Sequence, residues 1–348
     1  MLTPSEILIP FATGIEAQPN AVAITCAATG KWLATLDIAA LRNSRLLFIG
    51  IGASHAVLAT TVATLRAAGV YALRSDGDDL PDACPVLADW YIGVSQSGRS
   101  PEVVRALRHQ PDARRRIAIV NQPDSPLARE CGVPFCLGGL VDSGMSSVAL
   151  MATAVALGML SDAITGADHL ADWQRLPQRL AALAAAAQPV VSRFAAPLAG
   201  VGCVDFTARA SSLTAAEQGA LFLREGPKIP AMAAGTRNYL HGMTDSVGNT
   251  AHVIIGGARE TLLARQLTEF GVPILLITDG QDTAIAGVEI VSIPPMAPGP
   301  RALLEVLVME LLALALAEVW GSDIDAGVVK RLDTKLDQHG TLAEDKPS

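Results

Sequence analysis

The sequence predicts an α/β protein made of two tandem domains, each a parallel β-sheet flanked by helices. Three observations predict it. The chain has 348 residues, of which 50% are hydrophobic and 17% charged, and this suffices for two cores of ordinary domain size. Short apolar runs alternate with helix-length stretches, which is the pattern of a parallel sheet covered by helices. From about residue 198 onwards the pattern of the first half starts again.

The first strand–turn–helix unit lies at residues 45–69. The apolar run 45–49 leads into the turn Gly50–Ser54, and an alanine-rich stretch follows. Further strands of the first half are expected wherever apolar runs end in polar turns. These strand candidates are Val70–Leu73, Trp90–Val94, Ile117–Val120 and Phe135–Leu137.

The second half repeats three features of the first at similar spacing. Gly200 and Gly202 correspond to the glycines at 50 and 52, while 253–255 and 274–278 correspond to two first-half strands. A helical connector, interrupted by two prolines, is expected between the halves. The predicted organisation is an N-terminal segment (1–25), domain 1 (26–168), the connector (169–196), domain 2 (197–336) and a flexible tail (337–348).

Composition excludes several classes of protein. The formal net charge is −8 and neither end has a basic cluster, which argues against nucleic acid as a partner. Five cysteines without a C-x-x-C pair suggest neither disulfides nor a zinc ribbon, and they fit a reducing cytoplasm. The start lacks the pattern of a secretory signal. Val148–Leu160 is too short for a membrane span and Leu303–Trp320 carries three glutamates, so both are expected to be core helices.

Serine residues crowd the loop after the predicted strand at 90–94. This loop, residues 95–100 (SQSGRS), precedes Pro101 and Glu102, which suit the first turn of a helix. Ligands of a doubly wound sheet bind beyond the carboxyl ends of its strands. Hydroxyls and N–H groups at the positive end of a helix can surround a phosphate dianion without a lysine. We therefore expect a phosphate site here, with an ordinary serine-rich turn as the alternative.

The turn at residues 50–54 admits a second interpretation. Its glycines nearly match the G-x-G-x-x-G fingerprint of dinucleotide-binding folds, and Arg74 and Ser75 end the next strand, where a 2′-phosphate would bind. His55 at the third glycine position and the serine loop argue against it. An NAD(P)-dependent oxidoreductase stays an alternative.

Two residues of the second half are candidates for acid–base chemistry. Glu225 closes a helical pattern that stops at Gly226 and Pro227. A helix C-terminus disfavours negative charge, which suits a carboxylate that takes up a proton, although Arg224 beside it could make a simple ion pair. His241 lies in a predicted loop, where a lone histidine is ordinarily a solvated residue.

Taken together and in this order, the motifs resemble the tandem sugar isomerase (SIS) domain proteins. These include the isomerase half of glucosamine-6-phosphate synthase, fructoselysine-6-phosphate deglycases and aminosugar-phosphate deaminases. The resemblance covers roughly residues 12–336, and S-Q-S-G-x-[ST] is its most specific motif. It implies two flavodoxin-like three-layer sandwiches. Further residues that carry it are Glu16-Ala17-Gln18-Pro19, Asn121, Ser125-Pro126-Leu127-Ala128, Glu217-Gln218-Gly219-Ala220-Leu221 and His241-Gly242.

The resemblance also implies roles. Glu225 would move a proton between C1 and C2 of an open-chain sugar phosphate or amino-sugar phosphate, and His241 of a neighbouring subunit would open the ring. The chain would be a homodimer without cofactor or metal. Phosphate and sugar would be bound by Gly52, Ser54, Ser95, Gln96, Ser97, Ser100, Ser146 and a C-terminal lysine, Lys330 or Lys335.

Departures from the family limit this assignment. In the synthase the carboxylate closes a K-L-K-E run, whereas Phe222 here replaces the lysine that forms an imine, so imine chemistry is not expected at that position. Asn238 and Met243 stand where relatives often have Glu and Pro. The chain starts directly before the first sugar-binding domain, so a glutamine-hydrolysing half is not expected.

The sequence therefore predicts a cytoplasmic enzyme with no nucleic-acid or membrane partner, either an aldose–ketose isomerase or an aminosugar-phosphate deaminase or deglycase. A non-catalytic phosphosugar sensor that acts through protein contacts is the rival from another class. Glu225 together with His241 favours catalysis, because a sensor needs neither residue.

Overall fold

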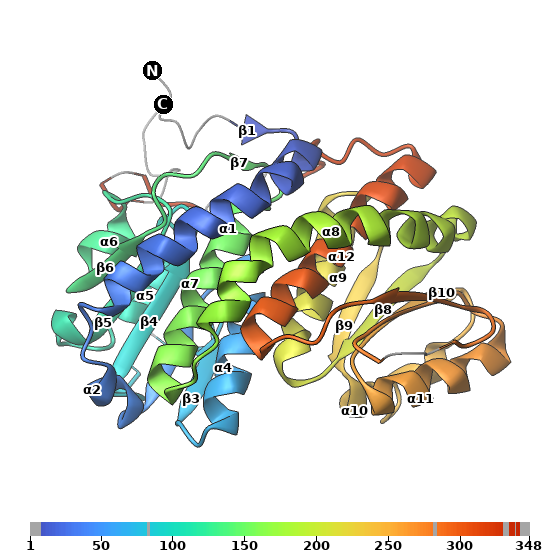
Figure 1. Cartoon of the computed structure of the whole chain (residues 1–348). Helices are drawn as coiled ribbons and strands as arrows, with labels where there is room; N and C mark the ends of the chain where they lie inside the picture. The colour runs from blue at the N-terminus through green and yellow to red at the C-terminus, as the bar shows by residue number, and fades with distance from the viewer. Residues whose placement is uncertain (1–7, 82–83, 281–283, 330–333, 338, 342–348) are drawn as a thin grey trace, which may run out of the picture.

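The computed structural model describes residues 8–81, 84–280, 284–329, 334–337 and 339–341. It contains two five-stranded sheets in which all neighbouring strands are parallel, with helices between and outside them (Figure 1). The predicted fold class is confirmed.

The first sheet has the strand order β3-β2-β4-β5-β6. Each strand lies within a few residues of its predicted position, because buried apolar runs bounded by polar turns are a local signal. The strands are β2 (Leu46–Ile49), β3 (Ala72–Ser75), β4 (Trp90–Ser95), β5 (Arg116–Val120) and β6 (Val133–Cys136).

The second sheet has the order β9-β8-β10-β11-β12, which is the order of the first sheet with each strand replaced by its counterpart. Identical topology in both halves supports an internal duplication. The strands are β8 (Cys203–Ala208), β9 (Ala231–Gly235), β10 (Thr250–Ile255), β11 (Ile274–Thr278) and β12 (Val288–Ser292).

One of the three predicted correspondences between the halves is wrong. Gly200 and Gly202 precede β8 instead of following it, and Gly200 takes φ +80° in the turn that leads into the strand. The counterpart of Gly52, which has φ +57°, is Ala210 after β8, with φ +51°. The true repeat has an alanine at this position, so glycine spacing could not reveal it.

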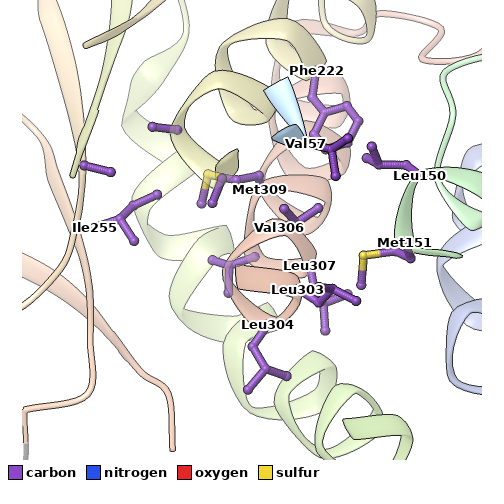
Figure 2. Packing of buried hydrophobic residues seen from close by; sticks show 14 of the residues in the cluster. Val57, Leu150, Met151, Phe222, Ile255, Leu303, Leu304, Val306, Leu307 and Met309 are labelled. Carbon is purple, nitrogen blue, oxygen red and sulfur yellow. The ribbon is translucent and has the colours of Figure 1, made fainter. Parts of the chain in front are cut away.

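Six helices form a middle layer between the sheets, and smaller helices cover the outer faces (Figure 1). One cluster of buried hydrophobic side chains includes Leu46 of the first half and Val204 of the second, and Figure 2 shows its centre around Phe222, Val306 and Met309. The two halves therefore share one core. The middle helices are α1 (Phe11–Leu33), α4 (Leu58–Ala67), α7 (Val148–Thr165), α8 (Leu170–Ala195), α9 (Leu213–Glu225) and α12 (Pro298–Trp320).

The remaining elements are short. The outer helices are α5 (Pro101–Leu107) and α6 (Pro126–Arg129) on the first sheet, and α10 (Thr236–Tyr239) and α11 (Ala258–Leu267) on the second. The others are α2 (Ile38–Arg42), α3 (Ala53–Ala56) and the parallel pair β1 (Leu8–Ile9) and β7 (Asp142–Ser143).

Helix α7 is longer than the apolar run 148–160 suggested. Its 18 residues are long and apolar enough to cross a membrane by length and composition, so the prediction from shortness is wrong, but 83% of this stretch is buried inside the protein. The burial shows a core helix, as it does for α12, whose Glu305 and Glu310 are also buried.

Helix α8 is continuous although Pro177 and Pro189 lie inside it. The predicted interruption of the connector is therefore wrong. A proline removes one backbone hydrogen bond and crowds the preceding turn. Along α8, buried side chains such as Trp173, Leu180 and Val191 pack on the core over the whole length, and this packing offsets that cost.

Candidate functional site

The first sheet has a topological switch point between β2 and β4. The chain leaves β2 towards β3 on one side and leaves β4 towards β5 on the other. Ligands of doubly wound sheets bind in the crevice that such a reversal opens at the carboxyl ends. The turn Gly50–Ser54 follows β2 and the serine loop, residues 95–100, follows β4. Both predicted phosphate-binding segments thus meet at one edge of the sheet.

The serine loop is shaped by its glycine. Gly98 has φ +62°, and a Cβ there would lie 2.0 Å from Ser125 Oγ. Within the loop, the buried hydroxyls of Ser95 and Ser100 are hydrogen-bonded at 3.1 Å. Ser97 is partly exposed, as is Gln96. Ser100 stands at the N-cap position of α5, but its side chain makes no cap bond to the helix and pairs with Ser95 instead.

Arg74, which the dinucleotide-binding alternative would use to bind a 2′-phosphate, is already paired with a carboxylate. Its guanidinium forms a bidentate ion pair with Glu217 of α9, with both N–O distances at 2.6 Å, and also donates to the His55 carbonyl at 3.3 Å. Burial and, secondarily, Arg74 lower the pKa of His55, although Glu217 acts against this. Because Arg74 is neutralised, the structure does not favour a 2′-phosphate site here.

Helix α9 of the second half lies along the turn at residues 50–54. Gln218 Nε2 donates to the Ala53 carbonyl at 2.7 Å, and Thr214 Oγ1 to the Ala56 carbonyl at 3.0 Å. The helix ends at Glu225, as the sequence predicted. At a rise of 1.5 Å per residue, Glu225 lies about 10 Å further along the axis than Gln218. The helix therefore holds Glu225 at a fixed distance from the turn at residues 50–54.

Phe222 points into the shared core. It is 2% exposed and packs edge-to-face on Phe11, with ring centroids 5.8 Å apart. Phe222 and Val57, which follows the helix α3, belong to the same buried cluster and are both labelled in Figure 2. An aromatic ring in this surrounding stabilises the contact between α9 and α1, and the position offers no amine for imine formation.

The C-terminal segment reaches the serine loop, a contact that the sequence analysis missed. Leu336 N donates to the Arg99 carbonyl at 2.8 Å, and Arg99 Nε donates to the Leu336 carbonyl. Leu336 is buried in the cluster on the outer face of the first sheet. Lys335 therefore lies next to the serine loop, whereas Lys330 lies outside the described residues. In the sequence, the apolar Leu336 among the charged residues at 333–337 could have indicated that this segment packs on the domain.

Ser146 precedes α7 and is held by a carboxylate. Its hydroxyl donates to Asp142 Oδ2 at 2.6 Å, while Asp142 Oδ1 accepts from the backbone N–H of Ser147 and Val148. Asp142 thus fixes the first turn of α7 through bonds that join charge to helix N–H groups. The sequence analysis did not single out Asp142, although an acidic residue shortly before a helix start is a capping signal.

In the second sheet, a buried side chain of the same half lies at the switch point between β8 and β10. After β10, the buried Glu260 carboxylate accepts from Gly257 N at 3.2 Å and from Thr236 Oγ1 at 2.9 Å. An internal negative group therefore lies where the first half presents serine hydroxyls. Among the described residues, no group of three or more His, Cys, Asp or Glu side chains could hold a metal ion.

No protein-family model matches the chain. In sequence it is 26% identical over 259 residues to a glutamine–fructose-6-phosphate aminotransferase (isomerizing) of Bradyrhizobium diazoefficiens, covering 68% of this chain and 42% of that protein. The chain thus spans about two fifths of this relative's length. The C-terminal domain of glucosamine-fructose-6-phosphate aminotransferase from Francisella tularensis superposes with a TM-score of 0.80 at 20% identity, over 90% of this chain and 97% of that one.

The chain has the fold that the tandem SIS resemblance implied. A glucosamine-6-phosphate deaminase from Thermotoga maritima shares the fold, with a TM-score of 0.72 at 18% identity, over 91% of this chain and 97% of that one. The resemblance stated from the motifs is confirmed at the level of the fold.

In the second half, His241 lies on an exposed turn after α10. Tyr239, two residues earlier, anchors this turn because its buried hydroxyl donates to Asp205 Oδ2 at 2.9 Å and lies 3.0 Å from His252 Nδ1. Burial lowers the pKa of His252. These hydrogen bonds of Tyr239 therefore hold in place the turn on which the exposed His241 lies.

Proposed function

We propose that this tandem SIS protein binds a sugar phosphate or amino-sugar phosphate and moves a proton between C1 and C2 of its open chain. The reaction is either aldose–ketose isomerisation or deamination or deglycation of an amino-sugar phosphate. The observation that carries the proposal is the docking of α9 on the turn at 50–54 through Gln218 and Ala53. Through this docking, one helix connects the proposed phosphate-binding turn to Glu225.

The phosphate is held by the serine loop and the turn after β2. Ser54, Ser95, Ser97 and Ser100 supply hydroxyl donors, and Gln96 an amide, at the carboxyl ends of β2 and β4. Gly52, with φ +57°, has no side chain and so lets the backbone of the turn come close to the phosphate. Lys335, and Lys330 by the family resemblance, supply positive charge from the C-terminal segment. Backbone and hydroxyl donors of this kind suit a dianion.

Glu225 acts as the base. Anchoring the phosphate fixes the far end of an open-chain hexose, and a span of about 10 Å along α9 suits the length of such a chain. The reacting carbons then meet a positioned carboxylate, so little orientational entropy is left to lose. Removing a proton next to a carbonyl also needs a donor near the oxygen, the role proposed for His241 of a second subunit.

The remaining assignments complete this picture. Ser146 contacts the sugar, the active form is a homodimer, and the protein works in the cytoplasm without cofactor, metal, nucleic acid or membrane. Because Phe222 replaces the family lysine, the proton transfer proceeds through an enediol or enolamine without an imine at that position.

A non-catalytic phosphosugar sensor is the second candidate, and Phe222 is the observation that favours it. A core aromatic at this position keeps the fold and removes a reactive amine. A sensor would bind sugar phosphates and leave the C2 proton in place.

The experiment incubates the protein with hexose, pentose and amino-sugar phosphates in D₂O and follows exchange at C2, isomer formation and ammonia. Glu225→Gln should abolish exchange and change phosphosugar affinity little, whereas the exposed Glu269→Gln should behave as wild type. Exchange retained in Glu225→Gln would reject the assigned base. Binding without exchange by the wild-type protein would favour the sensor.

A further inference from the structure

Three polar side chains from distant parts of the sequence meet in the middle layer. Gln18 of α1, Ser147 at the start of α7 and Glu310 of α12 are all 0% exposed. Gln18 Nε2 donates to Ser147 Oγ at 2.7 Å and to Glu310 Oε2 at 2.6 Å. We call these three residues the Gln18 cluster. None of the chemistry proposed above uses Glu310.

Two oxygen atoms of the Gln18 cluster lack a donor. Gln18 Oε1 and Glu310 Oε1 are buried, and within the described residues neither has a hydrogen-bond partner. An ionised carboxylate only accepts, so it leaves both oxygens unsatisfied at a cost typical of buried polar groups. A proton on Glu310 Oε1 changes this, because an acid and an amide can exchange one N–H···O and one O–H···O bond.

The charges around Glu310 point the same way. The groups that act on it are Gln18 from α1, Ser147 from α7 and the carboxylate of Asp142, and none of them is a cation. Burial, the largest cause, together with Asp142 raises the pKa of Glu310 to about 8, although the hydrogen bonds from Gln18 and Ser147 oppose the rise. A neutral carboxyl is therefore the main form at pH 7.

The Gln18 cluster is connected to the sugar side of the site. Ser147 N donates to Asp142 Oδ1 at 3.0 Å, and Asp142 Oδ2 accepts from the Ser146 hydroxyl at 2.6 Å. Helix α1 packs directly on this segment, since a Cβ at Gly14 would lie 3.3 Å from Ser147 Cβ. A change in the Gln18–Glu310 contact therefore acts on the start of α7, which Ser146 directly precedes.

We propose that Glu310 is a positioning residue: as a neutral acid, it donates a hydrogen bond to Gln18 Oε1. This bond holds Ser147 and the first turn of α7 in the geometry that binds the sugar. When Glu310 loses this proton, two acceptors face each other and the turn loosens. The effect on substrate rests on the proposed function, whereas the acid–amide pair itself does not.

The test compares wild type with Glu310→Gln, whose side-chain amide can donate to Gln18 Oε1 and accept from Gln18 Nε2 at every pH. The control is Glu318→Gln, the same change at an exposed position of α12. The first measurement is the free energy of unfolding by denaturant. The folded state keeps a proton that the unfolded chain releases, so wild-type stability relative to Glu310→Gln should fall as pH rises from about 4.5 to about 8 and then level off.

The second measurement is the Kd for fructose 6-phosphate above pH 7, where the phosphate is already a dianion. Wild type and Glu318→Gln should lose affinity several-fold through about pH 8, whereas Glu310→Gln should stay flat. Parallel stability profiles for wild type and Glu310→Gln would overturn the acid–amide pair. A stability difference with parallel affinities would overturn the positioning role. Absence of binding by all proteins would reject the proposed function and that role, and the stability profiles would still decide the pair.

Discussion

Arg74 of the first half and Glu217 of the second form a bidentate ion pair in which each side chain keeps only 20–23% of its surface exposed. Gln218, the next residue of α9, bonds the neighbouring turn at Ala53. The pair therefore helps to fix how the second half meets the turn at residues 50–54.

Removing one partner of this pair should cost more than removing both. We expect Arg74→Met to lower the free energy of unfolding by about 1–3 kcal/mol, because Glu217 then loses charged hydrogen bonds in a partly buried place. The double variant Arg74→Met/Glu217→Leu should recover part of the loss. Denaturant unfolding of wild type, Arg74→Met, Glu217→Leu and the double variant completes the cycle. Strictly additive changes would show that the two residues are not coupled.

Adding one methyl group at Gly98 should disturb the serine loop. The new Cβ would lie 2.0 Å from Ser125 Oγ, so the loop must move, and we expect the affinity for sugar phosphates to drop at least tenfold. Gly321→Ala is the matched control, since Gly321 also has φ +62° but has no atom within 4 Å of the new Cβ. It should cost only the backbone strain of about 1–2 kcal/mol. Equal effects on phosphosugar affinity would contradict the steric argument.

Restoring the family's lysine should not restore imine chemistry. Phe222→Lys exchanges a buried ring for a charge, and we expect a loss of at least about 3–5 kcal/mol in stability, the range for truncating a core aromatic. Borohydride treatment with a ketose phosphate should leave no covalent adduct by mass spectrometry. Phe222→Leu separates lost packing from buried charge. A stable, sugar-trapping Phe222→Lys protein would mean that position 222 faces the site.

Local patterns predicted the strands and the two loops that follow β2 and β4, because apolar runs, polar turns and a glycine with positive φ act over a few residues. The Gly200–Gly202 match failed because Ala210 adopts the conformation that Gly52 has in the first half. The contacts of Gln18 with Glu310 and of Arg99 with Leu336 join residues 292 and 237 positions apart. Nothing in the local sequence encodes such pairings, so they needed the folded chain.

The shared middle layer sets how the duplicated halves can behave. Since one hydrophobic cluster includes side chains from both sheets, either half on its own would expose a broad apolar surface to water. Denaturation should consequently proceed as a single cooperative event, and neither repeat could be excised as an independent folding unit. The two halves have diverged at the carboxyl edges of their sheets, where the first has the serine loop after β4 and the second has the buried Glu260 carboxylate after β10.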